Sequence, residues 1–278
     1  MPAFRPITLI TGASSGIGAA LARVFAANGH ELVLVARSEP KLVAIADEIG
    51  AKGATRPHVI PVDLGRLDGS ARIAHELVSR DLEPSYVVNN AGFGMAGLSD
   101  ELDRAEQLAM VDLNVRALTD LSLRWSESLQ RRRGGLLNVA SVAGFLPASG
   151  MAVYYATKAY VLSFSEALHL ELAPKGVRVT VLCPGPVATG FQARAGLRGR
   201  ERLTRLLGRS AERVAREGYD GLMAGKRLVV PGFGNKLITV LPRLVSRGTM
   251  LKLSDRRRGR EALAGPRWQT PRGSDKAP

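Results

Sequence analysis

The sequence predicts an α/β protein built on a doubly wound parallel sheet. Short apolar runs alternate with segments whose apolar residues recur at helical spacing. A glycine-rich turn, residues 11–18, directly follows the first apolar run, and polar motifs follow later runs. Strands that alternate with helices form parallel sheets with right-handed crossovers, and ligands bind beyond the carboxyl ends of those strands. The 278 residues fit one such domain.

The predicted strands are seven short apolar runs, which is typical of parallel strands buried on both faces. They cover residues 7–10, 32–35, 59–62, 86–88, 136–139, 178–182 and 227–230. The predicted helices between them cover residues 17–25, 41–49, 70–79, 102–130 and 154–172. Gly29 is placed to end the first helix, and Pro174 follows the last of them.

The C-terminal third adds two predicted helices, an arginine-rich one at about residues 201–217 and one at residues 235–248. In the second, an apolar face lies beside a basic stripe: Leu237, Ile238, Leu241, Leu244 and Val245 beside Lys236, Arg243 and Arg247. Such a helix is suited to contact an anionic membrane surface, here through residues 235–253. The favoured alternative is a lid or dimer helix packed on the protein's own core. Pro242 and Gly248 would weaken or shorten it in either case.

We therefore expect one domain at residues 1–253, of which about 187–253 form a substrate lid and a helical extension. Residues 254–278 are basic and rich in Pro, Gly and Ser, so we expect a disordered tail. The net charge of +14 is confined to the last third, because residues 1–193 hold 18 basic and 18 acidic side chains and residues 194–278 hold 21 and 7. That excess predicts a basic partner surface or, alternatively, reflects compositional drift. Nucleic-acid binding is not expected, since no recognition motif or interleaved aromatics accompany the charge.

The cysteine count and the N-terminus indicate a compartment. A single cysteine, Cys183, excludes internal disulfides and suits a reducing environment. The first predicted strand begins too early to leave room for a signal peptide, so we expect a cytoplasmic protein, with peripheral contact at a membrane surface if the C-terminal helix binds lipid. The four histidines are scattered without ligand spacing, and no metal is expected.

The glycine-rich turn predicts a dinucleotide site. Glycine lets the backbone approach a pyrophosphate closely, and a helix N-terminus offers free N–H groups and a positive dipole end. The turn combines glycines with two hydroxyl donors: Gly12, Ser14, Ser15, Gly16, Ile17 and Gly18. At the end of the second strand, Ala36 brings no repulsive charge and Arg37 can pair with a 2′-phosphate. We therefore expect NADP(H) to be preferred over NAD(H), unless Arg37 is only a solvated loop charge.

A second motif predicts proton transfer. Tyr154 and Lys158 are four residues apart, so on a helix they share one face, and Ser141 lies thirteen residues upstream. A nearby ammonium favours the phenolate and should lower the tyrosine pKa from about 10. Tyr154 would then be the general acid or base. Tyr155 is a rival phenol whose expected role is packing or lining a pocket.

Together these motifs resemble the short-chain dehydrogenase/reductase family, a Rossmann fold. The resemblance rests on T-G-x-x-x-G-x-G at residues 11–18, N-N-A-G at 89–92, Asn114, Ser141, Tyr154, Lys158, and P-G-x-x-x-T at 184–189. It implies that Ser141 holds the substrate oxygen, that Lys158 binds the nicotinamide ribose, and that Asn114 holds a water. It also assigns cofactor contacts to Asp63, Leu64, Asn90, Ala91, Gly92, Pro184, Gly185, Val187 and Thr189. Pairing into a homodimer or homotetramer through helices around Asn114 and Tyr154 is implied as well.

The sequence thus predicts an NADP(H)-dependent oxidoreductase that interconverts a carbonyl and an alcohol. Six side chains are candidates for an apolar substrate pocket suited to a lipophilic molecule: Phe93, Met95, Phe145, Met151, Tyr155 and Phe191. An alternative from another class is a protein that senses NADP(H) without chemistry, although such a protein has no need of Tyr154 and Lys158 together. A nucleotide-sugar epimerase or dehydratase would need a larger C-terminal domain than 278 residues readily allow.

Overall fold

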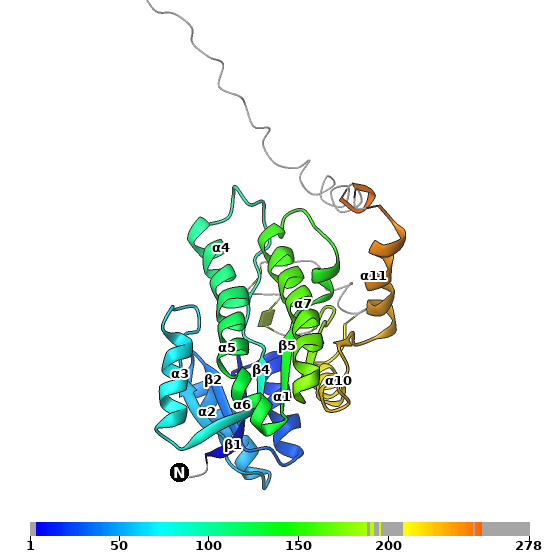
Figure 1. Ribbon diagram of the computed structural model, residues 1–278. Helices are drawn as coiled ribbons and strands as arrows, with labels where there is room; N and C mark the ends of the chain where they lie inside the picture. The colour runs from blue at the N-terminus through cyan, green and yellow to red at the C-terminus, as the bar shows by residue number, and fades with distance from the viewer. Residues whose placement is uncertain (1–3, 188–189, 192–194, 196–207, 247, 252–278) are drawn as a thin grey trace, which may run out of the picture.

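The structure, a computed structural model, describes residues 4–187, 190–191, 195, 208–246 and 248–251 (Figure 1). Its centre is one seven-stranded sheet in the order β3-β2-β1-β4-β5-β6-β7, in which every neighbouring pair is parallel. The strands are β1 (Arg5–Thr11), β2 (Leu32–Ala36), β3 (His58–Pro61), β4 (Leu82–Asn89), β5 (Gly135–Val139), β6 (Arg178–Leu182) and β7 (Leu228–Val229). The predicted doubly wound sheet is confirmed, and the strand order reverses between β1 and β4, where such sheets bind ligands.

Helices cover both faces of the sheet, because successive strand residues point to opposite sides. Leu32 and Leu34 of β2 join the core under α1, α2 and α10, whereas Val33 and Val35 join the opposite core under α3, α5 and α7. These helices are α1 (Gly16–Ala27), α2 (Glu39–Ala51), α3 (Gly69–Val78), α5 (Leu118–Arg124), α7 (Ala152–Leu172) and α10 (Ala211–Met223). Short 3-10 turns follow Ser141 and α7, at Val142–Phe145 and Ala173–Lys175.

The single helix predicted over residues 102–130 is wrong, because the chain there is interrupted twice. It forms α4 (Arg104–Val111), a π-helical turn (Asp112–Ala117), α5, and α6 (Ser126–Arg132), with a break at Trp125. The π turn carries Asn114, whose side chain exchanges two hydrogen bonds with the backbone of Phe93. A widened turn of this kind is often found at functional sites, where it redirects a side chain.

The predicted helices of the C-terminal third also differ from the structure. Among the described residues, the helix expected at 201–217 begins only at Ala211 as α10, because Ser210 caps it by accepting a hydrogen bond from the Arg213 N–H (3.2 Å). Residues 201–207 lie outside the described part. The helix expected at 235–248 is α11 (Phe233–Leu244), which ends before Val245.

Of the apolar face predicted for this helix, Leu237 is exposed, whereas Ile238 and Val245 are half-buried. Among the residues of α11 whose side chains are described, Asn235 and Thr239 are buried, whereas Leu237 is 63% exposed. The side chains of Leu241 and Leu244 lie outside the description, as does the predicted tail at residues 254–278. None of the helices in the described ranges has both the length and the apolar character needed to cross a bilayer.

Candidate functional site

The glycine-rich turn lies between β1 and α1 at the carboxyl edge of the sheet. Gly12 has φ +64°, and a Cβ there would lie 2.9 Å from the Ala91 Cα. A Cβ on Gly18 would lie 2.2 Å from the Gly12 carbonyl oxygen, so only glycine fits at this point. Ser15 precedes α1 in extended conformation and its side chain makes no capping hydrogen bond. The first N–H groups of α1 are therefore not capped by Ser15 and can meet an anion.

Asn90 stabilises the glycine-rich turn by hydrogen bonds, and this role was not predicted from the sequence. Its Nδ2 donates to the carbonyl oxygens of Thr11 (3.0 Å) and Gly12 (3.2 Å), while its own N–H donates to Thr11 Oγ1 (3.0 Å). The Ala91 N–H donates to the same hydroxyl (3.1 Å). The resemblance had implied contacts of Asn90 and Ala91 with a bound ribose, largely through backbone. In this arrangement the Asn90 side chain ties β4 to the glycine turn, and Gly92 lies beside Asn114 and Lys158.

The four candidate catalytic residues come together at the same edge. Ser141 follows β5, Tyr154 and Lys158 share a face of α7, and Asn114 lies in the π turn beside them. Tyr154, Lys158 and Asn114 are 8%, 6% and 1% exposed. The Lys158 Nζ lies 5.9 Å from the centre of the Tyr154 ring and donates to the Val139 carbonyl oxygen (2.9 Å).

Hydrogen bonds hold each of these side chains in place. Asn114 Nδ2 donates to Phe93 O (2.9 Å) and to Thr157 Oγ1 (3.1 Å), and the Thr157 hydroxyl donates to the Tyr154 carbonyl (2.7 Å). Asn114 therefore connects the loop after β4 to the first turn of α7. Ser141 Oγ accepts from the Ala143 N–H (3.1 Å). Its orientation is set by the 3-10 turn that follows it.

The expected lowering of the Tyr154 pKa is wrong for this arrangement. Burial raises the pKa of Tyr154 to about 12, and a hydrogen bond with Ser141 only partly opposes that rise. Burial also lowers the pKa of Lys158 to about 8. Each charged form loses more hydration than it gains from neighbours. The sequence spacing could not show this, since four-residue spacing brings two side chains to one face without revealing how deeply they are buried.

The residues expected at the adenosine end of the cofactor follow the carboxyl ends of β2 and β3. Arg37 is exposed just after β2, and its guanidinium makes no hydrogen bond or ion pair with another residue of the described ranges. Asp63 follows β3, and its Oδ1 accepts from the Gly65 N–H (2.9 Å). Leu64 is buried. Arg37, Asp63 and Leu64 therefore lie at the β3 and β2 end of the strand order, whereas Tyr154 lies near β5 on the other side of β1.

The turn after β6 continues the site. Pro184, Gly185 and Val187 are described, whereas Thr189 lies outside the described residues. The Pro184 carbonyl oxygen accepts from the Val142 N–H (3.0 Å) and from Ser141 Oγ (3.4 Å), so this turn contacts the Ser141 segment directly. Asn235 of α11 packs on Gly185 from the other side. Nothing in the sequence pattern pointed to Asn235.

Apolar side chains surround Tyr154. Buried Met110, Ala143, Met151 and Tyr154 form one cluster with partly buried Phe93, Met95, Ala96, Val153, Tyr155 and Phe191. The cluster includes five of the six residues predicted to line the pocket. Phe145 is the exception, because it packs in a different cluster with Val161 and Val181. The Phe191 ring lies 5.5 Å from the Tyr154 ring, centre to centre.

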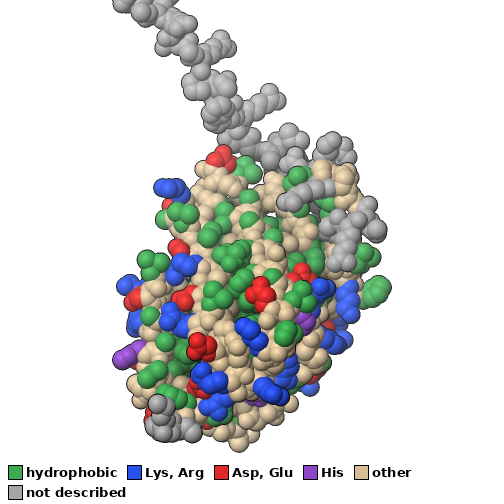
Figure 2. Space-filling view, in the orientation of Figure 1, with side chains coloured by type: hydrophobic (Ala, Val, Ile, Leu, Met, Phe, Trp, Pro, Cys, Tyr) green, Lys and Arg blue, Asp and Glu red, His purple; other side chains and the backbone are tan. Residues whose placement is uncertain are grey.

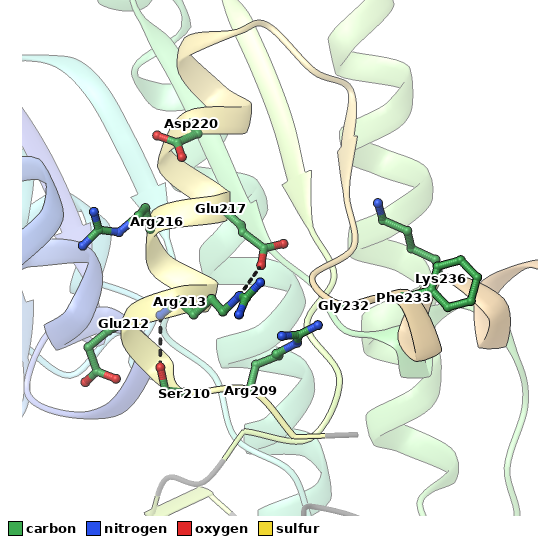
Figure 3. A pocket seen from close by; sticks show the side chains of 10 residues that line it. All are labelled: Arg209, Ser210, Glu212, Arg213, Arg216, Glu217, Asp220, Gly232, Phe233 and Lys236. Atoms are coloured by element: carbon green, nitrogen blue, oxygen red, sulfur yellow. Dashed lines mark hydrogen bonds and ion pairs between the residues drawn. The ribbon is translucent and has the colours of Figure 1, made fainter. Parts of the chain in front are cut away.

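A groove of about 670 Å³ lies away from these residues, between α10 and the start of α11 (Figure 3). Charged side chains of both signs line it, together with Phe233: Arg209, Glu212, Arg213, Arg216, Glu217, Asp220 and Lys236. Arg213 and Glu217 pair across one turn of α10 (3.3 Å). The acids offset most of the basic charge, so the groove is not a strongly cationic surface. Across the described residues, no group of three His, Cys, Asp or Glu side chains is arranged to hold a metal ion.

Comparison with known proteins agrees with this geometry. The sequence profile of the short chain dehydrogenases matches residues 6–198, which is more than half of the chain. This protein belongs to the short-chain dehydrogenase family. A sulfoacetaldehyde reductase 2 from Chromohalobacter salexigens is 35% identical over 188 residues, which are 66% of this chain and 74% of that one. An 11-beta-hydroxysteroid dehydrogenase from Pinus massoniana is 35% identical over 180 residues, 64% of this chain and 50% of that one.

Solved structures of the family extend the likeness over nearly the whole chain. A short-chain dehydrogenase from Sphingobium yanoikuyae in complex with NADPH superposes with a TM-score of 0.74 at 29% identity, and covers 97% of this chain and 99% of its own. A bulky-bulky ketone specific alcohol dehydrogenase from Comamonas testosteroni superposes with a TM-score of 0.70 at 28% identity, covering 97% and 98%. The likeness therefore includes the region after β6, beyond the part that the family profile matches.

Proposed function

We propose that this oxidoreductase uses NADP(H) to interconvert a carbonyl and an alcohol, with Tyr154 as the proton donor or acceptor. The observation that carries the proposal is the convergence of Tyr154, Lys158, Ser141 and Asn114 at the sheet edge that also holds the glycine-rich turn. One residue of each kind at a strand end is common. All four beside a dinucleotide turn are expected only where proton transfer accompanies hydride transfer.

The glycine turn fits the pyrophosphate of a dinucleotide. Side chains at Gly12 or Gly18 would collide with the backbone of residues 91 and 12, so the backbone itself forms the wall that a phosphate would approach. The N-terminus of α1 supplies donors that Ser15 does not cap. Gly16, at φ +56°, turns the chain into the helix. Ser14, Ile17, Asn90, Ala91, Gly92, Asp63, Leu64, Pro184, Gly185, Val187 and Thr189 are the proposed further contacts.

Arg37 supports NADP(H) over NAD(H). It is exposed at the end of β2, where this fold places the ribose 2′ position, and no described acid occupies its guanidinium. A planar guanidinium can bind a 2′-phosphate with two hydrogen bonds. The Sphingobium yanoikuyae relative was solved with NADPH. This chain therefore has the charge that NADP(H) requires and lacks, at Ala36, the acid that NAD(H) would favour.

In the reductive direction, the bound nicotinamide would supply hydride to the carbonyl carbon, and the carbonyl oxygen would take the proton of the Tyr154 hydroxyl. Ser141 is placed to hold that oxygen, because its hydroxyl interacts with Tyr154. Lys158, buried beside the Tyr154 ring, would hold the nicotinamide ribose by a hydrogen bond, and its ammonium would favour the phenolate form of Tyr154. Asn114 anchors the start of α7 and so orients both side chains.

The apolar cluster around Tyr154 supports a lipophilic substrate. Phe93, Met95, Met151, Tyr155 and Phe191 surround the phenol, and a polar substrate would leave its groups without partners among them. Relatives act on different substrates by name, from sulfoacetaldehyde to bulky ketones. The apolar lining around Tyr154 fits a bulky ketone better than it fits a sulfonate.

The test is oxidation of NADPH, followed by absorbance, against small polar and bulky lipophilic carbonyls. We expect turnover with the lipophilic members and loss of nearly all of it in Tyr154→Phe, which should still bind NADPH. Substantial turnover in that variant would remove Tyr154 from the mechanism. Tight NADPH binding by the wild type without turnover of any carbonyl would instead favour the alternative function, a non-catalytic sensor of NADP(H).

We also propose assembly into a homodimer or homotetramer through the helices that carry Asn114 and Tyr154. Large apolar side chains are exposed on α4, α5 and α7: Leu108, Val111, Leu123, Tyr160 and Leu170. Figure 2 shows hydrophobic side chains gathered on the face where these helices lie. Covering such side chains stabilises an interface. A monomeric mass by light scattering at micromolar concentration would contradict this assembly.

Contact of α11 with an anionic membrane surface is a further proposal, and it places the cytoplasmic protein at the bilayer periphery. Phe233, Leu237 and Val240 recur on one face and are 82%, 63% and 44% exposed. Residues 221–254 contain six Lys and Arg and no Asp or Glu, which suits anionic lipid better than a second copy of the same helix. Sedimentation with vesicles of phosphatidylcholine and phosphatidylserine should exceed that with phosphatidylcholine alone and fall in Leu237→Ser. Equal sedimentation would refute the contact.

A further inference from the structure

Asn235 is an unusual residue for the inner face of a C-terminal helix. It lies in the first turn of α11, its side chain is 2% exposed, and its neighbours on that face are otherwise apolar or threonine. Its Nδ2 donates to the Pro231 carbonyl oxygen (2.7 Å). Its Oδ1 is buried and accepts no hydrogen bond from the residues that the structure describes. A buried amide with an unpaired acceptor lowers stability, so a leucine would be the better residue here if packing alone mattered.

The Asn235 amide packs flat against the turn that follows β6. A Cβ placed on Gly185 would lie 2.2 Å from Oδ1 and 2.5 Å from both Cγ and Nδ2 of Asn235. Gly185 is therefore a glycine because the amide occupies its side-chain space. A Cβ on Gly232 would lie 3.4 Å from Asn235 Nδ2, so the amide also lies close to the turn that precedes α11.

The same turn supports Ser141. The Pro184 carbonyl, next to Gly185, accepts hydrogen bonds from Ser141 Oγ and from the Val142 N–H. The first turns of α11 also pack against the Val142–Phe145 segment. Asn235 thus contacts the backbone turn that orients Ser141, and the Ser141 hydroxyl in turn forms a hydrogen bond with Tyr154.

We propose that Asn235 is a positioning residue for the reaction. Its amide holds the Pro184–Gly185–Pro186 turn, and through it Ser141, at the spacing that proton transfer from Tyr154 requires. The proposal rests on the proposed function only for its kinetic consequence, because the contact between Asn235 and Gly185 is independent of the chemistry.

The experiment is a double-mutant cycle with Gly185→Ala and Asn235→Ala in the full chain. Gly185→Ala creates a collision with the amide, and Asn235→Ala removes the three atoms that collide. We expect Gly185→Ala to lower kcat by about 100-fold, since an error of about 1 Å in a reacting group costs that much. Asn235→Ala alone should lower kcat by about tenfold with little change in the KM for the carbonyl, and the double variant should recover at least about tenfold over Gly185→Ala.

Thr239→Val is the matched control. Thr239 is buried one turn further along α11, and its hydroxyl donates within the helix to Lys236 O (2.7 Å) without reaching the Gly185 turn. We expect its kcat to stay within about twofold of wild type. Thermal unfolding of all four variants separates misfolding from misplacement. Effects of the two substitutions that simply multiply, or a wild-type kcat in Asn235→Ala, would overturn the proposal.

A readout without turnover keeps this test separate from the test of the reductase. Binding of NADPH can be followed by its fluorescence in every variant. If the wild type reduces no carbonyl but binds NADPH, the collision should still weaken NADPH binding in Gly185→Ala and the second substitution should still restore it. Failure of that rescue would refute the coupling of Asn235 to the turn, whatever the reaction is.

Discussion

Lys158 should make the stability of this protein rise with pH in the alkaline range. Burial lowers the pKa of Lys158 from 10.5 to about 8, and among the described residues the ammonium has only the Val139 carbonyl as a hydrogen-bond partner. At pH values between about 8 and 10.5, the unfolded chain binds more protons at Lys158 than the folded chain does. The free energy of unfolding therefore increases as pH rises through the folded-state pKa. Below that pKa the buried ammonium lowers the stability by its full amount.

The size of the effect follows from the shift. The whole pKa shift lowers the free energy of unfolding by about 3 kcal/mol at low pH. About 2 kcal/mol of that free energy should be regained between pH 7 and about pH 9.5. Lys158→Met removes the titrating group and keeps an apolar chain of similar length. The variant also leaves the Val139 carbonyl unpaired, but that cost does not depend on pH and cancels when slopes are compared.

The assay is denaturant unfolding of wild type and Lys158→Met at pH 7 and pH 9.5. We expect the wild type to gain about 2 kcal/mol more than the variant across this range. Lys175→Met is the control, since Lys175 is exposed after α7 and should leave the slope of the wild type unchanged. Parallel pH profiles for wild type and Lys158→Met would refute the reasoning, because they would mean that Lys158 is well solvated or already paired.

The remaining predictions concern the cofactor site. Arg37→Asp should weaken NADPH binding by at least about tenfold and move preference toward NADH, because an acid repels the 2′-phosphate and can accept from a 2′-hydroxyl; unchanged NADPH affinity would show that Arg37 is not the selector. Gly18→Ala places a Cβ 2.2 Å from the Gly12 carbonyl and should abolish NADPH binding while costing about 1–3 kcal/mol of stability, measured by fluorescence and by unfolding. Asn90→Ala frees the glycine turn and should raise the Kd for NADPH by about tenfold with the fold intact, whereas an unaltered Kd would mean that the turn holds its shape alone.

Much of the fold could be predicted because its strands and helices follow from local patterns of apolar residues in the sequence. Each of the seven strands was located by an apolar run such as Leu32–Ala36, and a parallel sheet follows from their alternation with helices. The helix over residues 102–130 was predicted as continuous because its apolar spacing does not change. The π turn in this segment is accompanied by tertiary hydrogen bonds between Asn114 and the backbone of Phe93. Such long-range contacts cannot be predicted from the periodicity of apolar residues.

The candidate site divides in the same way. Gly12, Gly18, Tyr154 and Lys158 could be singled out because spacing alone puts them on a turn and on one helix face. Asn235 could not, since its partner Gly185 is fifty residues away in sequence and their contact exists only when α11 packs on the turn after β6. The burial of Asn235 and Thr239 on α11 could not be predicted for the same reason, because a helical wheel shows which residues lie together but not which side meets the core.

By itself the sequence determined the order of strands and helices, the glycine turn and the placing of reactive side chains at strand ends, because backbone conformation and periodicity are local properties. Tertiary structure alone decided the electrostatics of the site. Burial raises the pKa of Tyr154 and lowers that of Lys158, reversing the effect expected for the tyrosine from spacing. Desolvation depends on every atom packed around a charge, and those atoms come from β5, β6, α7 and the loop after β4, which meet only in the folded chain.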